Sequence, residues 1–119
     1  MHALLIVAHG SRKQDSNQEV RNLTRKVADQ VKKFDLVECA FLELAQPDIV
    51  EGGSKLAEAG ATTLTVLPYF LVEGRHVASD VPNEVNKIRN LHPDINVTLL
   101  PYFGASESII SELVGRVSI

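Results

Sequence analysis

Four short apolar runs, each followed by a segment of helical periodicity, constrain the fold of this chain more than any other feature. The runs cover residues 3–8, 36–42, 62–67 and 95–100 and are rich in branched side chains. An apolar run of this length is typical of a strand that is covered on both faces of a parallel sheet. We therefore predict an α/β protein in which four parallel strands alternate with four helices.

The segments between the runs repeat their apolar residues with the 3.6-residue period of amphipathic helices. In the first of them, Ser16 and Glu19 have the spacing of an N-terminal capping box. The apolar positions are Val20, Leu23, Val27, Val31 and Phe34 in the first helix, Val81, Val85, Ile88 and Leu91 in the third, and Ile109, Ile110, Leu113, Val114 and Val117 in the fourth.

Proline, glycine and aspartate mark the ends of the middle helices. Pro47 suits the first turn of the second helix, and Gly60 suits its C-terminal end. Gly52 and Gly53 lie inside that helix, where each costs about 1 kcal/mol relative to alanine, so we expect close packing there. Asp80 is predicted to cap the third helix.

Right-handed crossovers place such helices on both faces of the sheet. For the sheet we predict the flavodoxin-like strand order 2-1-3-4 in a three-layer αβα arrangement. A length of 119 residues fits one domain over residues 1–119.

Composition excludes several classes of function. The formal net charge is −3 and the basic residues are dispersed, which argues against nucleic acid or an anionic membrane as a partner. Cys39 is the only cysteine, so we expect it to fill core space and to form no intrachain disulfide. No apolar segment approaches the roughly 20 residues that span a bilayer. We expect a cytoplasmic protein.

Three residues with metal-binding side chains follow neighbouring strands of the predicted sheet. His9 comes directly after the first strand, Glu43 ends the second, and His76 lies in the loop after the third. Ligands of open parallel sheets bind at the carboxyl ends of the strands. Two imidazoles and a carboxylate suit a first-row divalent ion, although a loop histidine is as often a plain hydrogen-bonding residue.

Two other interpretations of the first strand's end remain open. Backbone donors at a strand-to-helix turn such as residues 9–12 can cradle phosphate, but the chain has neither of the glycine-rich nucleotide motifs. A histidine followed by glycine at this place is also found in histidine phosphatases, which carry arginine where this chain has Ala8. This hydrolase interpretation is the lower-ranked alternative.

The loop after the third strand combines apolar residues with a cation and an imidazole. Such a loop, running into a helix N-terminus, can clasp a flat, partly apolar ligand that carries carboxylates. This stretch covers residues 70–82.

Three blocks resemble one known family. The segments LIVAHGSR (5–12), FLELAQP (41–47) and FLVEGRHVASDVP (70–82) are similar, in order and spacing, to the signature blocks of the CbiX and SirB type II chelatases, the sirohydrochlorin cobaltochelatases. The resemblance covers nearly the whole chain. It implies insertion of a divalent metal into sirohydrochlorin without ATP or an organic cofactor, with cobalt as the expected metal and nickel or iron as alternatives.

The resemblance also implies roles for individual residues. His9 would be both metal ligand and proton acceptor, His76 the second ligand, and Glu43 an aid to metal or substrate. The loop formed by Leu71, Val72, Glu73, Gly74 and Arg75 would line the macrocycle pocket. Arg12 and Arg75 are candidates to pair with the carboxylates of the tetrapyrrole. Longer relatives contain two such domains, so this chain would correspond to half of that architecture and act as a homodimer. A noncatalytic carrier of tetrapyrrole or metal is the alternative.

Overall fold

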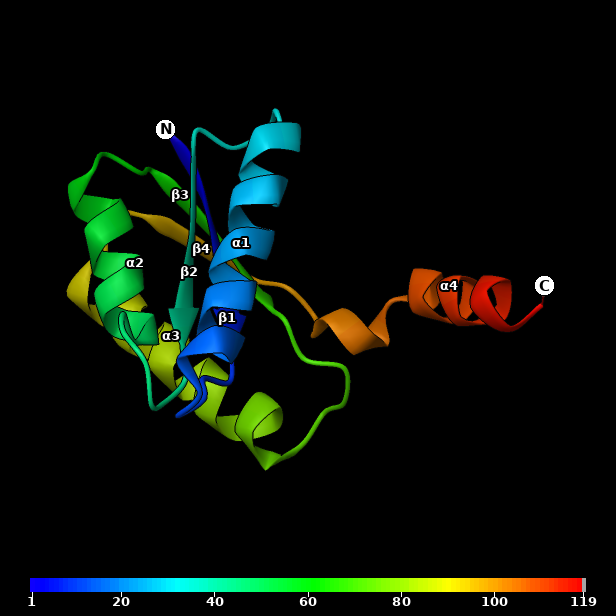
Figure 1. Cartoon of the computed structure of the whole chain (residues 1–119). Helices are drawn as coiled ribbons and strands as arrows, with labels where there is room; N and C mark the ends of the chain where they lie inside the picture. Colours follow the sequence, from blue (N-terminus) through cyan, green and yellow to red (C-terminus); the bar gives the residue numbers. More distant parts are fainter. Residues whose placement is uncertain (119) are drawn as a thin grey trace.

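The computed structural model describes residues 1–118, with only the backbone of His76. Four parallel strands form one sheet: β1 (His2–Ala8), β2 (Leu36–Phe41), β3 (Thr63–Pro68) and β4 (Asn96–Leu99). Their order is β2-β1-β3-β4. Figure 1 shows the alternation of strand and helix that produces this order. The predicted fold class and strand order are confirmed.

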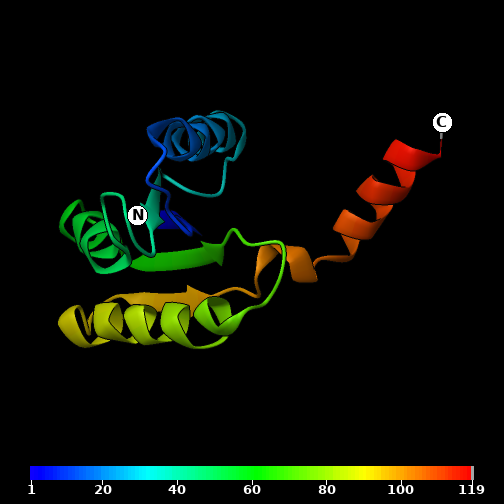
Figure 2. The same cartoon turned by 60° about the horizontal axis from the view of Figure 1, so that its bottom comes forward.

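Helices cover the two faces of the sheet unequally. Helix α1 (Gln14–Gln30) packs over the β1 and β2 side of one face. Helices α2 (Ile49–Glu58) and α3 (Val81–Leu91) pack side by side on the opposite face. Helix α4 (Glu107–Val117) follows a short 3-10 turn, η2 (Phe103–Ala105), and projects away from the sheet (Figure 2).

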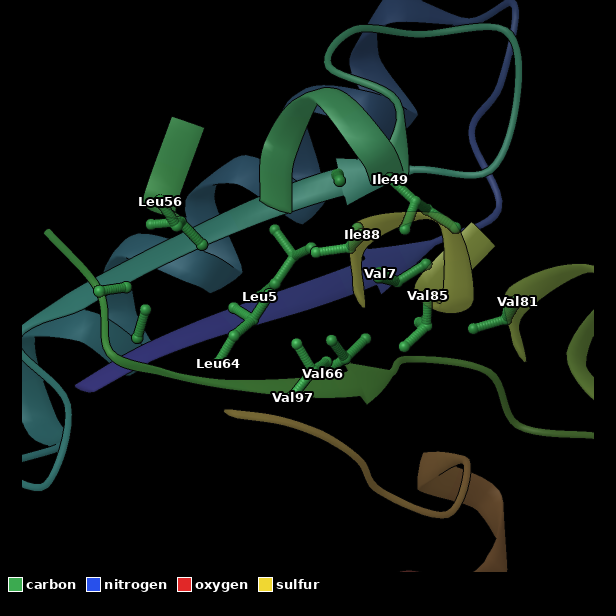
Figure 3. Packing of buried hydrophobic residues seen from close by; sticks show 13 residues of the cluster. Leu5, Val7, Ile49, Leu56, Leu64, Val66, Val81, Val85, Ile88 and Val97 are labelled. Carbon is green, nitrogen blue, oxygen red and sulfur yellow. The ribbon is translucent and has the colours of Figure 1, made fainter. Parts of the chain in front are cut away.

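The larger core lies between the sheet and the α2–α3 layer. Figure 3 shows alternate side chains of β1 and β3 meeting the inner faces of both helices. Gly52 and Gly53 allow α2 to lie this close to the sheet and to α3, as predicted from their position inside the helix. A Cβ on Gly53 would lie 2.5 Å from Cδ1 of Ile88, and one on Gly52 would lie 3.0 Å from Cβ of Ala40.

Gly53→Ala is therefore expected to destabilise the fold. The added methyl group would displace the fully buried Ile88, and overpacking of this kind costs about 1–3 kcal/mol, more than the helix propensity that alanine gains. Gly115→Ala in α4 is the matched control, because a Cβ there meets nothing within 4 Å. Urea unfolding should show a lower midpoint for the first variant alone, and equal midpoints would contradict the packing described.

The smaller core lies under α1. Its buried members come from β1 and β2, and Cys39 is one of them, as predicted. Burial raises the pKa of the Cys39 thiol, and a hydrogen bond with Thr24 opposes this shift only in part. A thiol in this environment is a packing residue rather than a nucleophile.

Four local predictions were wrong. One concerns Pro47, which precedes the N-cap of α2 and so lies before the helix rather than in its first turn. Helix α1 begins at Gln14 after Lys13, without a side-chain cap, so Ser16 and Glu19 form no capping box; the helix also ends before Phe34. The capping box lies instead in α2, where Asp48 and Glu51 bond reciprocally. The reason is that tertiary packing of the preceding loop decides where a helix begins, and the pattern of residues alone does not.

Asp80 does not cap α3 as predicted. It ends a π-helical turn, η1 (His76–Asp80), that runs directly into α3, and its backbone is already helical. A residue within continuous helical backbone cannot adopt the extended conformation of an N-cap. In the described part of the chain, no helix is long and apolar enough to cross a membrane.

Candidate functional site

Backbone pairing beyond the ends of β1 and β2 builds the site. The Leu42 amide donates to the Ala8 carbonyl at 2.9 Å, and the Glu43 amide donates to the His9 carbonyl at 3.1 Å. This pairing carries His9 and Glu43 out of the sheet side by side. Nε2 of His9 lies 3.4 Å from Oε1 of Glu43, and each side chain is about half exposed, at 47% and 48%.

Glycine at position 10 permits this close approach. Gly10 has φ +92°, and a Cβ on it would overlap the backbone carbonyl of Glu43. The chain therefore turns sharply after His9, and this turn packs directly against the backbone of the segment that carries Glu43. Leu44 adopts φ +66°, so both loops turn sharply at the site. A residue with a side chain at position 10 would push the two loops apart.

Asn17, a residue that the sequence analysis did not single out, clamps the loop after His9. It is 1% exposed. Its Oδ1 accepts from the Ser11 amide at 2.9 Å, while its Nδ2 donates to the Ser11 carbonyl at 2.8 Å. The sequence carried a signal, because Asn17 lies three residues before Val20 on the buried face of α1. A polar residue at such a position is buried for its hydrogen bonds.

The His9 ring has a defined environment. Its Nδ1 lies 3.3 Å from the Gly10 carbonyl, and the ring meets Phe70 edge to face, with centroids 6.3 Å apart. A carbonyl oxygen only accepts, so a neutral ring that keeps this contact carries its proton on Nδ1. Nε2 faces Glu43.

The loop after β3 lies on the surface near His9. Leu71 is 69% exposed and Val72 76% exposed, and Glu73, Gly74 and Arg75 are exposed as well. Exposed apolar residues beside polar ones are typical of a ligand-binding edge. Arg12 is also exposed, in the loop between β1 and α1. The side chain of His76, the predicted second metal ligand, lies outside the described residues.

A hollow of about 470 Å³ adjoins Glu43. One wall consists of Leu42 and Glu43. The other wall is a polar face of η1 and α3 with helical spacing, formed by Asp80, Asn83, Glu84 and Lys87. Lys87 and Glu84 form an ion pair at 2.9 Å. This wall was not among the features predicted from the sequence, although the spacing i, i+3, i+4 and i+7 could have indicated it.

Two of the three predicted metal ligands, His9 and Glu43, are brought together. Among the side chains that the structure describes, no three histidine, cysteine, aspartate or glutamate residues gather closely enough to hold an ion. A half-exposed imidazole and carboxylate can bind a cation from solution, exchange it and accept a proton. The arrangement therefore suits transient handling of a metal ion.

Similarity to known proteins agrees with this chemistry. The chain is 36% identical over 121 residues to the sirohydrochlorin ferrochelatase of Priestia megaterium, covering 99% of this chain and 44% of that protein. It is 34% identical over 120 residues to the sirohydrochlorin cobaltochelatase of Sulfurisphaera tokodaii, covering 98% and 92%. The chain thus spans less than half of the first relative and nearly all of the second.

Structural similarity extends over the same range. The crystal structure of the sirohydrochlorin chelatase SirB from Bacillus subtilis subspecies spizizenii in complex with cobalt superimposes with a TM-score of 0.87 at 28% identity. The match covers 98% of this chain and 50% of that one. The family model described as CbiX matches residues 3–119. This chain belongs to the CbiX family.

Proposed function

We propose that this protein inserts a divalent metal ion into sirohydrochlorin, with cobalt as the first candidate and nickel or iron as alternatives. The observation that carries the proposal is the 3.4 Å approach of His9 Nε2 to Glu43 Oε1 at the carboxyl edge of the sheet. Ligands of open parallel sheets bind at this edge. The names of the relatives, a ferrochelatase and a cobaltochelatase, leave the metal open.

The distance between the two donor atoms suits a shared metal ion. A first-row ion binds histidine nitrogen and carboxylate oxygen at about 2.1 Å. With the donors 3.4 Å apart, the angle at the ion is about 110°, close to tetrahedral. In this proposal His76 supplies a further nitrogen. Two or three protein ligands hold an ion firmly enough to deliver it and weakly enough to release it.

The same residues also assist the deprotonation of the macrocycle. Sirohydrochlorin must lose two pyrrolic protons when a divalent ion enters. His9 Nε2 is freed as the ion transfers, and an imidazole takes up protons near neutral pH. The Glu43 carboxylate at 3.4 Å then stabilises the imidazolium. One proton thus exchanges with the metal at this nitrogen, and the second pyrrolic proton passes to solvent.

The exposed loop of residues 71–75 fits a flat ligand. Leu71 and Val72 expose most of their surface, which a tetrapyrrole face would cover. Arg12 and Arg75 offer guanidinium groups to the peripheral carboxylates, and such pairs are frequently bidentate. Local cations of this kind offset the net charge of −3, which does not attract an anionic substrate.

A visible spectrum tests the proposal and separates it from the carrier alternative. Purified protein at a small fraction of the sirohydrochlorin concentration is mixed with cobalt, nickel or iron(II) at matched concentrations, and the spectrum is followed with time. We expect conversion of many equivalents of sirohydrochlorin per protein for at least one metal. A change that stops at one equivalent would identify a carrier and contradict catalysis.

A further inference from the structure

Helix α1 contacts both loops of the candidate site with two side chains that lie one turn apart. Asn17 bonds the amide and the carbonyl of Ser11, in the loop after β1. Arg21 donates from its guanidinium group to the Gln46 carbonyl at 3.2 Å, in the loop after β2. Residues four apart lie on the same face of a helix. Both loops leave the sheet at the end where α1 begins (Figure 1), so one rigid element holds both of them.

A buried aromatic ring fixes the place of the Arg21 guanidinium group. Its Cζ lies 5.2 Å from the centroid of the Phe41 ring, within the range of a cation–π contact. Phe41 is the last residue of β2 and is fully buried, so its ring is a rigid platform. The Phe41 amide also donates to the Pro47 carbonyl at 2.9 Å, which closes the loop that contains Glu43. Arg21 therefore holds this loop from a fixed position beside the sheet.

These contacts form a closed ring through the two loops. From α1 the ring passes through Ser11 to His9, two residues earlier in the chain. The Glu43 amide donates to the His9 carbonyl at 3.1 Å, and Gly10 packs against the Glu43 backbone. Gln46 follows three residues after Glu43 and returns the ring to α1. A loop that is held on both sides cannot swing independently, so the separation of the two side chains depends on the contacts with α1.

Packing alone does not explain these contacts. Val20 of α1 packs on the core under the helix, whereas Asn17, although only 1% exposed, is polar. A polar residue in such a place is buried for its hydrogen bonds, and here they go to Ser11. Gln46 is exposed, so water would satisfy its carbonyl in the absence of Arg21. What the two side chains of α1 have in common is that each holds one loop of the site.

We propose that Asn17 and Arg21 are positioning residues that set the distance between Nε2 of His9 and Oε1 of Glu43. The inference rests on the proposed function, in which both atoms bind the incoming metal ion. Groups that orient metal ligands typically contribute about 10- to 100-fold in metal affinity. Asn17 and Arg21 bond the loops after β1 and β2, whereas the loop proposed to hold the macrocycle follows β3. They should therefore affect the binding and transfer of the metal and not the affinity for the tetrapyrrole.

Arg21→Met distinguishes positioning from simple electrostatics, with Co²⁺ alone as the probe. Methionine keeps an apolar side chain over Phe41 and loses the bond to the exposed Gln46 carbonyl, so the fold should persist. Removal of a positive charge by itself favours the binding of a cation, because like charges repel. Positioning predicts the opposite: the Kd for Co²⁺, measured by titration of the full chain, should rise about 10-fold. Arg21→Lys keeps a donor for the carbonyl and should restore most of the affinity.

Two control variants lie on the same helix. Arg25→Met removes the same charge one turn further along α1, where the guanidinium bonds Asn22 of that helix, and its Kd for Co²⁺ should be unchanged or lower. Asn17→Ala should raise the Kd about 10-fold or more. Thr24→Val is its control, because Thr24 is also buried but bonds the Val20 carbonyl within α1. Urea unfolding should show lower midpoints for Asn17→Ala and Thr24→Val, but only the first should bind Co²⁺ more weakly.

A double-mutant cycle with His9→Ala shows whether these effects pass through the metal ligand. In the His9→Ala background, Arg21→Met should change the Kd for Co²⁺ by less than about two-fold. In the insertion assay, kcat should fall for Asn17→Ala and Arg21→Met while KM for sirohydrochlorin stays the same. If His9→Ala leaves the Kd for Co²⁺ unchanged, the proposed metal site is wrong and the inference fails with it. If His9→Ala weakens binding but Asn17→Ala and Arg21→Met do not, or if Arg21→Met acts equally in the His9→Ala background, the site stands and the positioning role is refuted.

Discussion

His9→Ala is expected to lower the rate of metal insertion into sirohydrochlorin by at least about 100-fold. The variant loses a ligand for the incoming ion and the acceptor for a departing proton, and removal of a positioned base alone costs roughly 10²–10⁴ in rate. The folded state should persist, because the side chain is about half exposed and meets Phe70 edge to face. The measurement is the initial rate followed by visible absorbance.

His92→Ala provides the control for this variant. His92 also accepts or donates one hydrogen bond, to Ser54 at 2.9 Å, but it lies at the C-terminal end of α3, far along the helix from the site. Its loss should leave the insertion rate within a factor of two or so of the parent. The insertion rate of Glu43→Gln should fall between those of His9→Ala and His92→Ala, because the amide keeps an acceptor oxygen and loses the charge. An undiminished rate in His9→Ala would remove the basis of the proposed mechanism.

Gly10→Ala is expected to cost about 2–4 kcal/mol of folding free energy and most of the activity. Two effects add: the backbone at φ +92° disfavours any side chain, and the new Cβ overlaps the Glu43 carbonyl. The loops must separate, which moves the carboxylate away from His9. A displacement of 1 Å in a reacting group can cost roughly 100-fold in rate. Urea unfolding and the insertion assay measure the two losses.

Gly60→Ala separates the two effects. Gly60 also has positive φ, +109°, but the only atom near its added Cβ is the flexible end of Met1. It lies after α2, at the opposite edge of the sheet from the site. This variant should show the backbone strain without the loss of activity. If both variants lose stability equally and both remain active, the contact between the His9 and Glu43 loops does not need glycine.

The strands and their order were predictable because each rests on a strong local signal. The run at residues 3–8 can be buried on both faces only in the middle of the sheet, and β1 indeed lies between β2 and β3. Gly52 and Gly53 were correctly interpreted as a close contact, since glycine inside a helix needs a reason. Gly60 ends α2 as predicted, with the positive φ that suits it.

The helix boundaries were less predictable because competing caps differ by little free energy. Ser16 and Glu19 match the capping pattern, yet the Asn17 clamp on Ser11 draws those residues into the helix. A cap contributes about 1 kcal/mol, and two buried hydrogen bonds to a loop contribute as much or more. Asp80 does not cap α3 for a related reason, because the π-helical turn that ends at this residue continues into α3.

The proximity of His9 and Glu43 was predictable, but their detailed geometry was not. The rule that ligands bind at strand ends selected His9 and Glu43 from the sequence, and pairing beyond the strands brings them to 3.4 Å. The polar wall at Asn83 and Lys87 has no signal except its helical spacing, which is equally typical of a solvated helix face. Which face of α3 meets Glu43 depends on how the helix packs on the sheet.

The sequence by itself determined the alternation of strands and helices, the sheet order and the edge at which His9 and Glu43 gather, because hydrophobic period and chain connectivity are local properties. The tertiary structure alone decided the close contact of the His9 and Glu43 loops, the Asn17 clamp and the direction of α4. The apolar residues of α4 predict an amphipathic helix, but they contain no information on the direction in which the helix leaves the sheet. That direction depends on Gly104 and the turn against residues 70–71, a long-range contact that no periodicity encodes.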